Sequence, residues 1–340
     1  DTESERAVQQ ALEVLMQAEQ PIAKLLVNHR DVTGDFSPFL LSLTYTDHMD
    51  GEADGLELVL EDTDKRWIRG WYPVKGSTVE AWVGYEGLPL LSCGEFQIDE
   101  IEVTGPPDTV TIRAVGDATR KALRTSRSRA YEGASLRTIA QQVASQHALT
   151  LVGAVPDVHW RRVTQHRETD LAFLQRIAAE HGLIFTVKGD KLIFHEIAKL
   201  EAQAAILTIT REDVVSFSFR DKVVPGSSSS SYFRGDTKEL EVVEVQLADQ
   251  THPDKKKSRR RTEGKAHGQR LAKAALRVGK SMEREASLGL PGNVSLVAGA
   301  NVALSGWGVL DGLWLAKSAT HKIDRSSGYT TDLEVRHVSA

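Results

Sequence analysis

Cysteine is almost absent from this sequence, and its absence excludes two kinds of stabilised protein. Cys93 is the single cysteine among 340 residues, so no intrachain disulfide and no cysteine-rich zinc site can form. Nothing in the composition therefore requires an oxidising compartment, and we expect synthesis inside the cell.

Long hydrophobic runs are also lacking. No stretch approaches the roughly 18 uninterrupted apolar residues of a membrane-spanning helix. The first residues, DTESER, are acidic and polar, unlike the start of a signal peptide. We therefore predict that the protein does not cross a membrane.

Positive charge is scarce except in one segment. The formal net charge is −5, but residues 252–285 contain twelve Lys and Arg against four Asp and Glu, a local charge of +8 that leaves −13 elsewhere. An acidic body with one basic segment predicts a local electrostatic contact. The run KKKSRRR at 255–261 has no interleaved aromatics, so we predict a flexible basic loop rather than a nucleic-acid site.

Hydrophobic periodicity divides the chain into four parts. Residues 1–20 place apolar residues at helical spacing and predict a helical extension. Residues 21–117 contain six short alternating runs separated by Gly, Pro and Asp, which predicts a small antiparallel barrel or sandwich. Residues 201–340 return to alternation around a helix through Leu271 and Met282.

The intervening residues 118–200 contain two similar helix–strand units. Ser135 can cap the first helix, and Thr169 or Glu168 can open the second. The units align at an offset of 34 residues, where VASQHAL matches IAAEHGL. The predicted fold is therefore α+β and mainly β. Two barrel-like β domains (21–117 and 201–340, the second with a basic loop and helix at 252–287) flank an α+β middle region (118–200).

The stretch DGEADGLELVLE at 50–61 resembles a calcium loop, because acids alternate before a glycine and a glutamate closes the stretch: Asp50, Glu52, Asp54, Gly55 and Glu61. An EF-hand also needs flanking helices and an apolar residue at its eighth position, where Glu57 stands. We predict a turn at 50–55 and a strand at 56–61, with the acids at the surface and no bound metal.

Three further motifs have structural explanations. Gly279-Lys280-Ser281 ends like a phosphate loop, but its approach is helical rather than a strand. The serine run 227–231 is predicted to be a loop or an edge strand. The third group contains residue types that could serve acid–base catalysis or bind a metal: His166, Glu168, Asp170, Glu180 and His181.

Ordinary helix electrostatics accounts for most of that set. The positive N-terminal end of a helix stabilises acids such as those at 168–170. The negative C-terminal end would stabilise a protonated His181 in the last turn. We therefore predict no catalytic, cofactor-binding or metal-ligating residue. A peptidoglycan hydrolase using Glu168 or Asp170, and a nucleic-acid binder using 255–261, are the alternatives.

Several long stretches resemble the phage late control D family, the baseplate hub of contractile tails. They occur in the family's order: LELVLEDTDKRW, VKGSTVEAWVGY and CGEFQIDEIEVTGPPDTVTIRA, then TQHRETDLAFLQRIAAEHGL, then AGANVALSGWGVLDGLWLAKSATHKIDRSSGYTTDLEV. The resemblance runs from about residue 21 to the end of the chain.

This resemblance implies a structural protein similar to the hub portion of type VI secretion spikes. In such hubs, two related β-barrel domains per chain form a ring of six barrels in a trimer. The ring is an adaptor between the sixfold tail tube and the threefold puncturing spike. The implied partners are two further copies, the central spike protein, the tail tube or tube-initiator protein and other baseplate proteins. The implied site is a tail baseplate assembled after synthesis in the bacterial cytoplasm.

Overall fold

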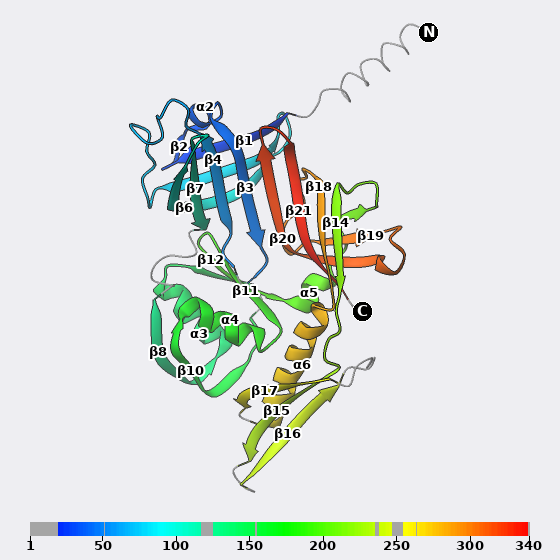
Figure 1. Cartoon of the computed structure of the whole chain (residues 1–340). Helices are drawn as coiled ribbons and strands as arrows, with labels where there is room; N and C mark the ends of the chain where they lie inside the picture. The colour runs from blue at the N-terminus through cyan, green and yellow to red at the C-terminus, as the bar shows by residue number, and fades with distance from the viewer. Residues whose placement is uncertain are drawn as a thin grey trace.

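The computed structural model describes residues 20–50, 52–116, 125–153, 155–234, 238–246, 254–262 and 264–338. The helical extension predicted at 1–20 lies outside these ranges except for Gln20. No helix in the described ranges is both long and apolar enough to cross a membrane. Figure 1 shows a large sheet, a middle region of helices and strands, and a small sheet beside a long helix.

The large sheet has 13 strands and contains both predicted β regions. The first region supplies β1 (Pro21–Val27), β2 (Arg30–Asp31), β3 (Leu40–His48), β4 (Gly55–Glu61), β5 (Thr78–Tyr85), β6 (Leu91–Thr104) and β7 (Thr109–Gly116), with the short helix α2 (Thr33–Phe36) after β2. The second region supplies β13 (Leu207–Ile209), β14 (Ser216–Asp221), β18 (Arg284–Pro291), β19 (Asn301–Leu304), β20 (Gly312–Asp324) and β21 (Gly328–His337), with a 3-10 turn η2 (Gly308–Leu310).

The two β regions are joined through the backbone pairing of β3 with β20. The sheet runs β14-β18-β21-β20-β3-β4-β7-β6-β5-β1-β2, with β19 beside β20 and β13 beside β19. The sheet has two main cores, one around Trp67 and Phe96 and one around Trp314 and Leu333, and Ile323 and Tyr329 of the second region pack into the first. In β4 the alternation of buried leucines with outward Glu57 and Val59 confirms the predicted strand.

The middle region contains β8 (Ser126–Ser135), α3 (Leu136–Gln146), β9 (Thr150–Gly153), β10 (His159–Thr169), α4 (Asp170–Ala179), β11 (Leu183–Lys188), β12 (Lys191–Glu196) and α5 (Ile197–Glu201). The two predicted helix–strand units are confirmed. Ser135 and Thr169 each accept a hydrogen bond from the backbone N–H three residues on. The strands β8 and β10, which pair with each other, were not predicted because the largely polar β8 has little alternation.

The small sheet corrects two predictions for the second β region. It contains β16 (Glu239–Gln246), β15 (Ser227–Arg234) and β17 (Lys255–Thr262) in that order, beside α6 (Lys265–Ser281). The basic run is therefore a strand and not a loop, and the serine run is the central strand and not an edge. Small serine side chains let α6 approach closely, because a Cβ at Gly268 would lie 2.8 Å from Ser230 Oγ.

Candidate assembly surfaces

The connection between β4 and β5 exposes a group of large apolar side chains, which we name the aromatic loop patch. Its members are between 42% and 69% exposed: Ile68, Trp71, Tyr72 and Val74. Tryptophan and tyrosine are enriched among residues that dominate protein interfaces, since each buries much surface at little cost in conformational entropy. The patch is therefore a candidate binding surface.

The loop that presents this patch is firmly anchored. Trp67 is buried beneath it, 4.7 Å from the ring of Phe36 and 5.4 Å from the ring of Trp71. The backbone N–H of Trp67 donates to Asp62 Oδ1 at 2.9 Å. The guanidinium of Arg66 lies 4.8 Å from the Trp71 ring, close enough for a cation–π contact. A cavity of about 330 Å³ lies beside these rings, so the surface is both rigid and indented.

A second apolar surface lies at the end strand β14, and we name it the β14 edge patch. It contains Val215, Phe217, Trp307 and Arg211. Phe217 is 42% exposed and lies 5.1 Å from the Trp307 ring, while the guanidinium of Arg211 lies 4.4 Å from Phe217. Among the described strands β14 pairs only with β18. An unpaired edge with exposed apolar groups is a site where another chain can add.

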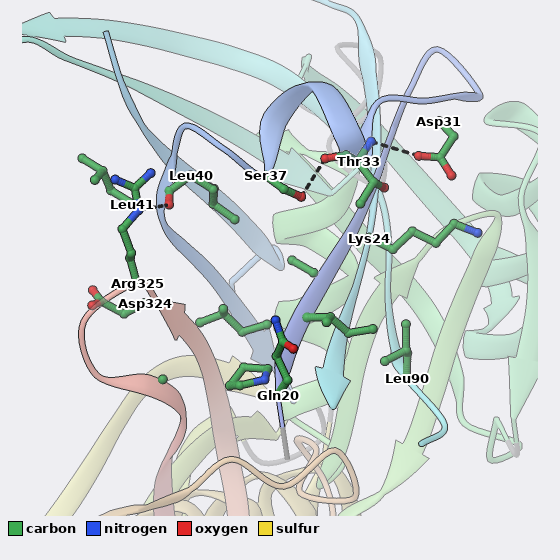
Figure 2. Close-up of a pocket in the computed structure, with 15 residues that line it drawn as sticks. Gln20, Lys24, Asp31, Thr33, Ser37, Leu40, Leu41, Leu90, Asp324 and Arg325 are labelled. Atoms are coloured by element: carbon green, nitrogen blue, oxygen red, sulfur yellow. Dashed lines mark hydrogen bonds between the residues drawn. The ribbon is translucent and has the colours of Figure 1, made fainter. Parts of the chain in front are cut away.

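The opposite end of the sheet contains a cleft of about 710 Å³ between β1 and the turn that joins β20 to β21. Figure 2 shows its walls, with Lys24 and Gln20 on one side and Arg325 on the other. The strand β2 pairs with β1 only at Leu26 and Val27, so the preceding residues of β1 have no strand partner on this side in the described structure. The cleft therefore offers backbone donors and acceptors to an extended segment.

The acid and histidine set at 166–181 does not form one site. His166 is exposed on β10, and Glu168 pairs with Arg176 at 3.0 Å. Asp170 is fully buried at the start of α4, whereas Glu180 caps the other end of that helix. Asp170 already accepts hydrogen bonds from His147, Arg129 and Gln165. The geometry favours a structural role for this carboxylate over acid–base work.

The helix dipole would favour a cation at His181, but the surroundings of this ring at the end of α4 oppose its protonation. Burial, with smaller effects of Arg270 and His267, lowers the pKa of His181 to about 4. The ring packs edge-on against Trp160 at 5.3 Å, and neither ring nitrogen has a hydrogen-bond partner in the described structure. The environment therefore stabilises the neutral imidazole, because a charged ring would lose hydration without a compensating partner.

The acids of residues 50–61 are only partly at the surface, contrary to expectation. Asp54 is largely buried, and burial raises its pKa in spite of Lys188 nearby. Lys188 Nζ lies 3.3 Å from Asp54 and also pairs with Asp47, and the two carboxylates outweigh burial to raise the lysine pKa. This buried cluster joins the middle region to the large sheet. One oxygen of Asp54 also accepts the backbone N–H of His48 at 2.9 Å, so it is not available as a calcium ligand.

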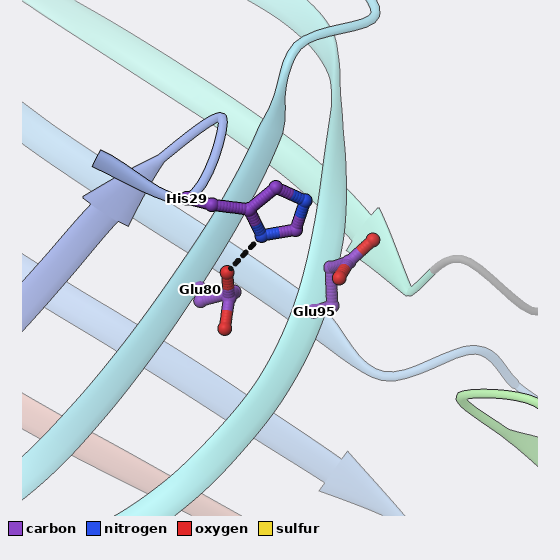
Figure 3. A group of neighbouring side chains, drawn as sticks. All are labelled: His29, Glu80 and Glu95. Atoms are coloured by element: carbon purple, nitrogen blue, oxygen red, sulfur yellow. Dashed lines mark hydrogen bonds and ion pairs between the residues drawn. The ribbon is translucent and has the colours of Figure 1, made fainter.

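One group of described side chains has spacing compatible with a metal ion. Figure 3 shows His29 beside Glu80 and Glu95, whose potential ligand atoms all lie within 4.8 Å of one another. His29 Nδ1 already lies 2.8 Å from Glu80 Oε1, and the histidine side chain is 72% exposed. Glu80 and Glu95 face each other across β5 and β6, and His29 contacts the first of them. The hydrogen bond between His29 and Glu80 accounts for the arrangement, so we assign no metal to the group.

The phosphate-loop motif also has a structural role only. Gly279, Lys280 and Ser281 form the last turn of α6, where carbonyl groups rather than free N–H groups are exposed. A phosphate loop needs the opposite end of a helix, so the prediction that this motif does not bind a nucleotide is supported by its position.

Comparison with known proteins gives these surfaces a context. The sequence pattern of the family described as phage tail baseplate hub (GPD) matches residues 98–327, more than half of the chain. The chain belongs to this family. A probable baseplate hub protein of Escherichia phage 186 is 33% identical over 204 residues, which are 57% of this chain and 50% of the relative. The chain thus spans about half the length of that curated relative.

Solved structures show the same fold at low sequence identity. The tail protein from Neisseria meningitidis superposes with a TM-score of 0.72 at 12% identity, over 94% of this chain and 97% of the other. An Escherichia coli component of the type VI secretion system superposes with a TM-score of 0.57 at 12% identity, over 87% of this chain and 73% of the other. The expected likeness of this hub family to secretion-system proteins is therefore confirmed at the level of the fold.

The two apolar patches of this hub protein relate differently to the family match. The β14 edge patch lies within residues 98–327, whereas the aromatic loop patch precedes them. Sequence analysis identified neither surface, since exposure of an aromatic ring depends on the strands around it. The sequence did contain one indication of the aromatic loop patch. In WIRGWY at 67–72, three aromatic residues and a glycine fall between two predicted strands.

Proposed function

We propose that this protein is a homotrimeric adaptor of a contractile phage tail or tail-like particle, joining the sixfold tail tube to the threefold central spike. The observation that carries the proposal is the unpaired, apolar edge of β14 in a member of the baseplate hub family. A monomer would leave this edge open to uncontrolled pairing, whereas a closed ring covers it.

The β14 edge patch is proposed to contact a second copy of the chain. The patch and the β1 cleft are different surfaces at the two ends of one sheet. A contact between two different surfaces repeats from copy to copy and closes into a ring when the rotation fits. Each chain has two β cores, so three copies supply the six units that a sixfold tube requires.

The aromatic loop patch is proposed to bind another tail protein along the axis of the ring, either the spike or the tube. Its anchored loop loses little entropy on binding, and Trp71, Tyr72 and Arg66 are of the types that dominate interface energies. The predicted division at 21–117, 118–200 and 201–340 belongs to the same proposal, as does assembly into the baseplate after synthesis in the bacterial cytoplasm.

The proposal assigns no enzymatic activity, metal or cofactor to the chain. Asp170 is held in a buried hydrogen-bond cluster and Glu168 in an ion pair. The hydrolase hypothesis therefore has no available carboxylate pair at these positions. In the basic strand β17, Lys255 pairs with Glu244 of the same small sheet, so at least one of its charges is balanced within the chain.

Native mass spectrometry of the purified full chain tests the trimer. We expect three copies in the wild type and in the control Val103→Glu, which adds a charge to an exposed valine of β6. We expect monomer from Phe217→Glu, because a carboxylate in the β14 edge patch would be buried unpaired in the contact. The melting temperature of each variant checks folding. A folded wild type that stays monomeric at micromolar concentration contradicts the proposal.

A further inference from the structure

A cavity of about 300 Å³ lies where four elements meet: the ends of α5, β16 and β21 and the C-terminal half of α6. Its charged lining consists of Lys273, Arg277, Lys280, Arg336 and Glu201. Four cations and a single carboxylate thus surround one small space, in a protein whose formal net charge is −5. Neither the assembly surfaces nor the basic strand β17 is part of it.

The three cations on α6 lie on one helix face at spacings of four and three residues. Like charges at this spacing destabilise a helix by a few tenths of a kcal/mol. Among the described residues, no carboxylate lies within ion-pair distance of Lys273, Arg277 or Lys280, although such pairs are found for many other cations of the chain. In the described part of the chain no ion pair offsets the repulsion among these three cations, of which Lys273 and Arg277 are exposed to solvent.

The helix dipole explains only part of this arrangement. Lys280 lies in the last turn of α6, where a cation is favoured by the negative end of the helix. Lys273 lies two turns earlier, beyond the reach of that effect. Arg336 comes from β21, its side chain is only 6% exposed, and Glu201 neutralises it at 2.8 Å. Two separate elements thus bring positive charge to the same space, and Glu201, the one carboxylate in the described lining, pairs with only one of the four cations.

We propose that this cavity binds a compact oxyanion with two or more negative charges, of which a phosphate or diphosphate group is the best match. The guanidinium of Arg277 can bind two oxygens side by side, and Lys273 and Lys280 add point charges that need no fixed geometry. A space of 300 Å³ is at the lower limit of small-ligand pockets, which suits one or two phosphate groups. Binding at this site does not depend on formation of the trimer.

Isothermal titration calorimetry on the full chain tests the site with two probes, inorganic pyrophosphate and a tetraglutamate peptide. The site variant is Lys273→Gln with Arg277→Gln. The matched control is Lys75→Gln with Lys191→Gln, which removes the same charge from exposed positions away from the cavity. Thermal melting of each variant checks that it is folded. A loss of binding in a folded variant then cannot be attributed to unfolding.

We expect pyrophosphate to bind the wild type and the control alike and to bind the site variant at least about tenfold more weakly. Tetraglutamate binding that is lost in the same variant, without pyrophosphate binding, overturns the proposal of a compact oxyanion and indicates an acidic segment of a protein as the ligand. Absence of binding of both probes to the wild type overturns the proposal. Equal binding to the wild type and the site variant also overturns it.

Discussion

Asp170 Oδ2 lies 2.8 Å from Nε2 of His147, and the two side chains are 0% and 3% exposed. The contact joins the end of α3 to the start of α4 and so fastens one repeated unit of the middle region to the other. Burial opposes the charge of Asp170, but hydrogen bonds from His147, Gln165 and Arg129 outweigh it and hold the carboxyl pKa below its ordinary value. The carboxylate therefore stays ionised at neutral pH.

Asp170→Ala is expected to lower the free energy of unfolding by about 3 kcal/mol, since it leaves the buried side chains of His147 and Gln165 and the partly buried guanidinium of Arg129 without their carboxylate. Urea denaturation at pH 7 measures the change. The stabilisation by Asp170 is present above the unfolded carboxyl pKa near 3.8 and is lost as the pH falls through the lower folded value. A wild-type-like unfolding curve for Asp170→Ala contradicts this account.

Glu168→Gln is the matched control for that experiment. Glu168 is a neighbouring acid whose ion pair with Arg176 is partly exposed. Partly exposed pairs contribute little, so we expect a change within about 1 kcal/mol. A loss as large as that of Asp170→Ala would show that the helix start, and not the buried cluster, determines the stability.

Lys188→Met is expected to destabilise the contact between the middle region and the large sheet by about 2–3 kcal/mol, because it leaves the buried carboxylates of Asp47 and Asp54 unpaired. Urea denaturation of the variant measures this loss. Lys322→Met serves as the comparison, since Lys322 pairs with Asp324 nearer the surface and should change stability by less than about 1 kcal/mol. Equal losses in the two variants would exclude a special role for the buried cluster.

Calcium is expected to give no binding isotherm with the wild type in titration calorimetry. The loop at 50–61 lacks flanking helices, and two of its acids are engaged, Asp54 with Lys188 and Glu57 with Arg113. Calcium binding that disappears in Asp50→Asn would show that the loop ligates the ion in spite of these contacts.

Local patterns predicted local structure well in this chain. Ser135 and Thr169 were identified as possible helix starts because capping depends on a few neighbouring residues. The strand at β4 was identified because only one of its faces is buried. Apolar and polar residues therefore alternate in its sequence.

Features that depend on distant neighbours were not predictable in the same way. The basic run became a strand because the serine strand β15 provides its hydrogen-bond partners from about 30 positions away. Asp54 is largely buried beside Lys188, which comes from the distant strand β11. The residues near position 54 in the sequence give no indication of that contact. The interface residues likewise depend on which aromatic side chains the fold leaves uncovered, as at Trp71 and Phe217.

His181 is expected to make the protein less stable as the pH falls from about 6.5 to 4. Its folded pKa of about 4 is below the unfolded value of 6.5, so the unfolded state binds more protons in this window and is favoured by acid. Urea denaturation at pH 7 and pH 5 measures the free energy of unfolding at each pH. The difference between the two values should be smaller in His181→Phe than in the wild type.

Gly268 and Ser230 set the distance between α6 and the small sheet, and a double-mutant cycle can measure their coupling. An alanine at 268 would place its Cβ 2.8 Å from Ser230 Oγ, which donates a buried hydrogen bond to the Gly268 carbonyl at 2.9 Å. Helix propensity favours alanine over glycine by about 1 kcal/mol, but displacing the hydroxyl costs about 1–3 kcal/mol. We therefore expect Gly268→Ala to destabilise the wild type by about 1 kcal/mol.

In a Ser230→Ala background the same Gly268→Ala change meets no hydroxyl, so the propensity gain should remain and the substitution should be neutral or stabilising. The difference between the two backgrounds is the coupling energy, expected at about 1–2 kcal/mol from urea denaturation of all four proteins. An identical effect of Gly268→Ala in both backgrounds would contradict close contact between α6 and β15. Small serine side chains would then not be what allows the helix to approach the central strand.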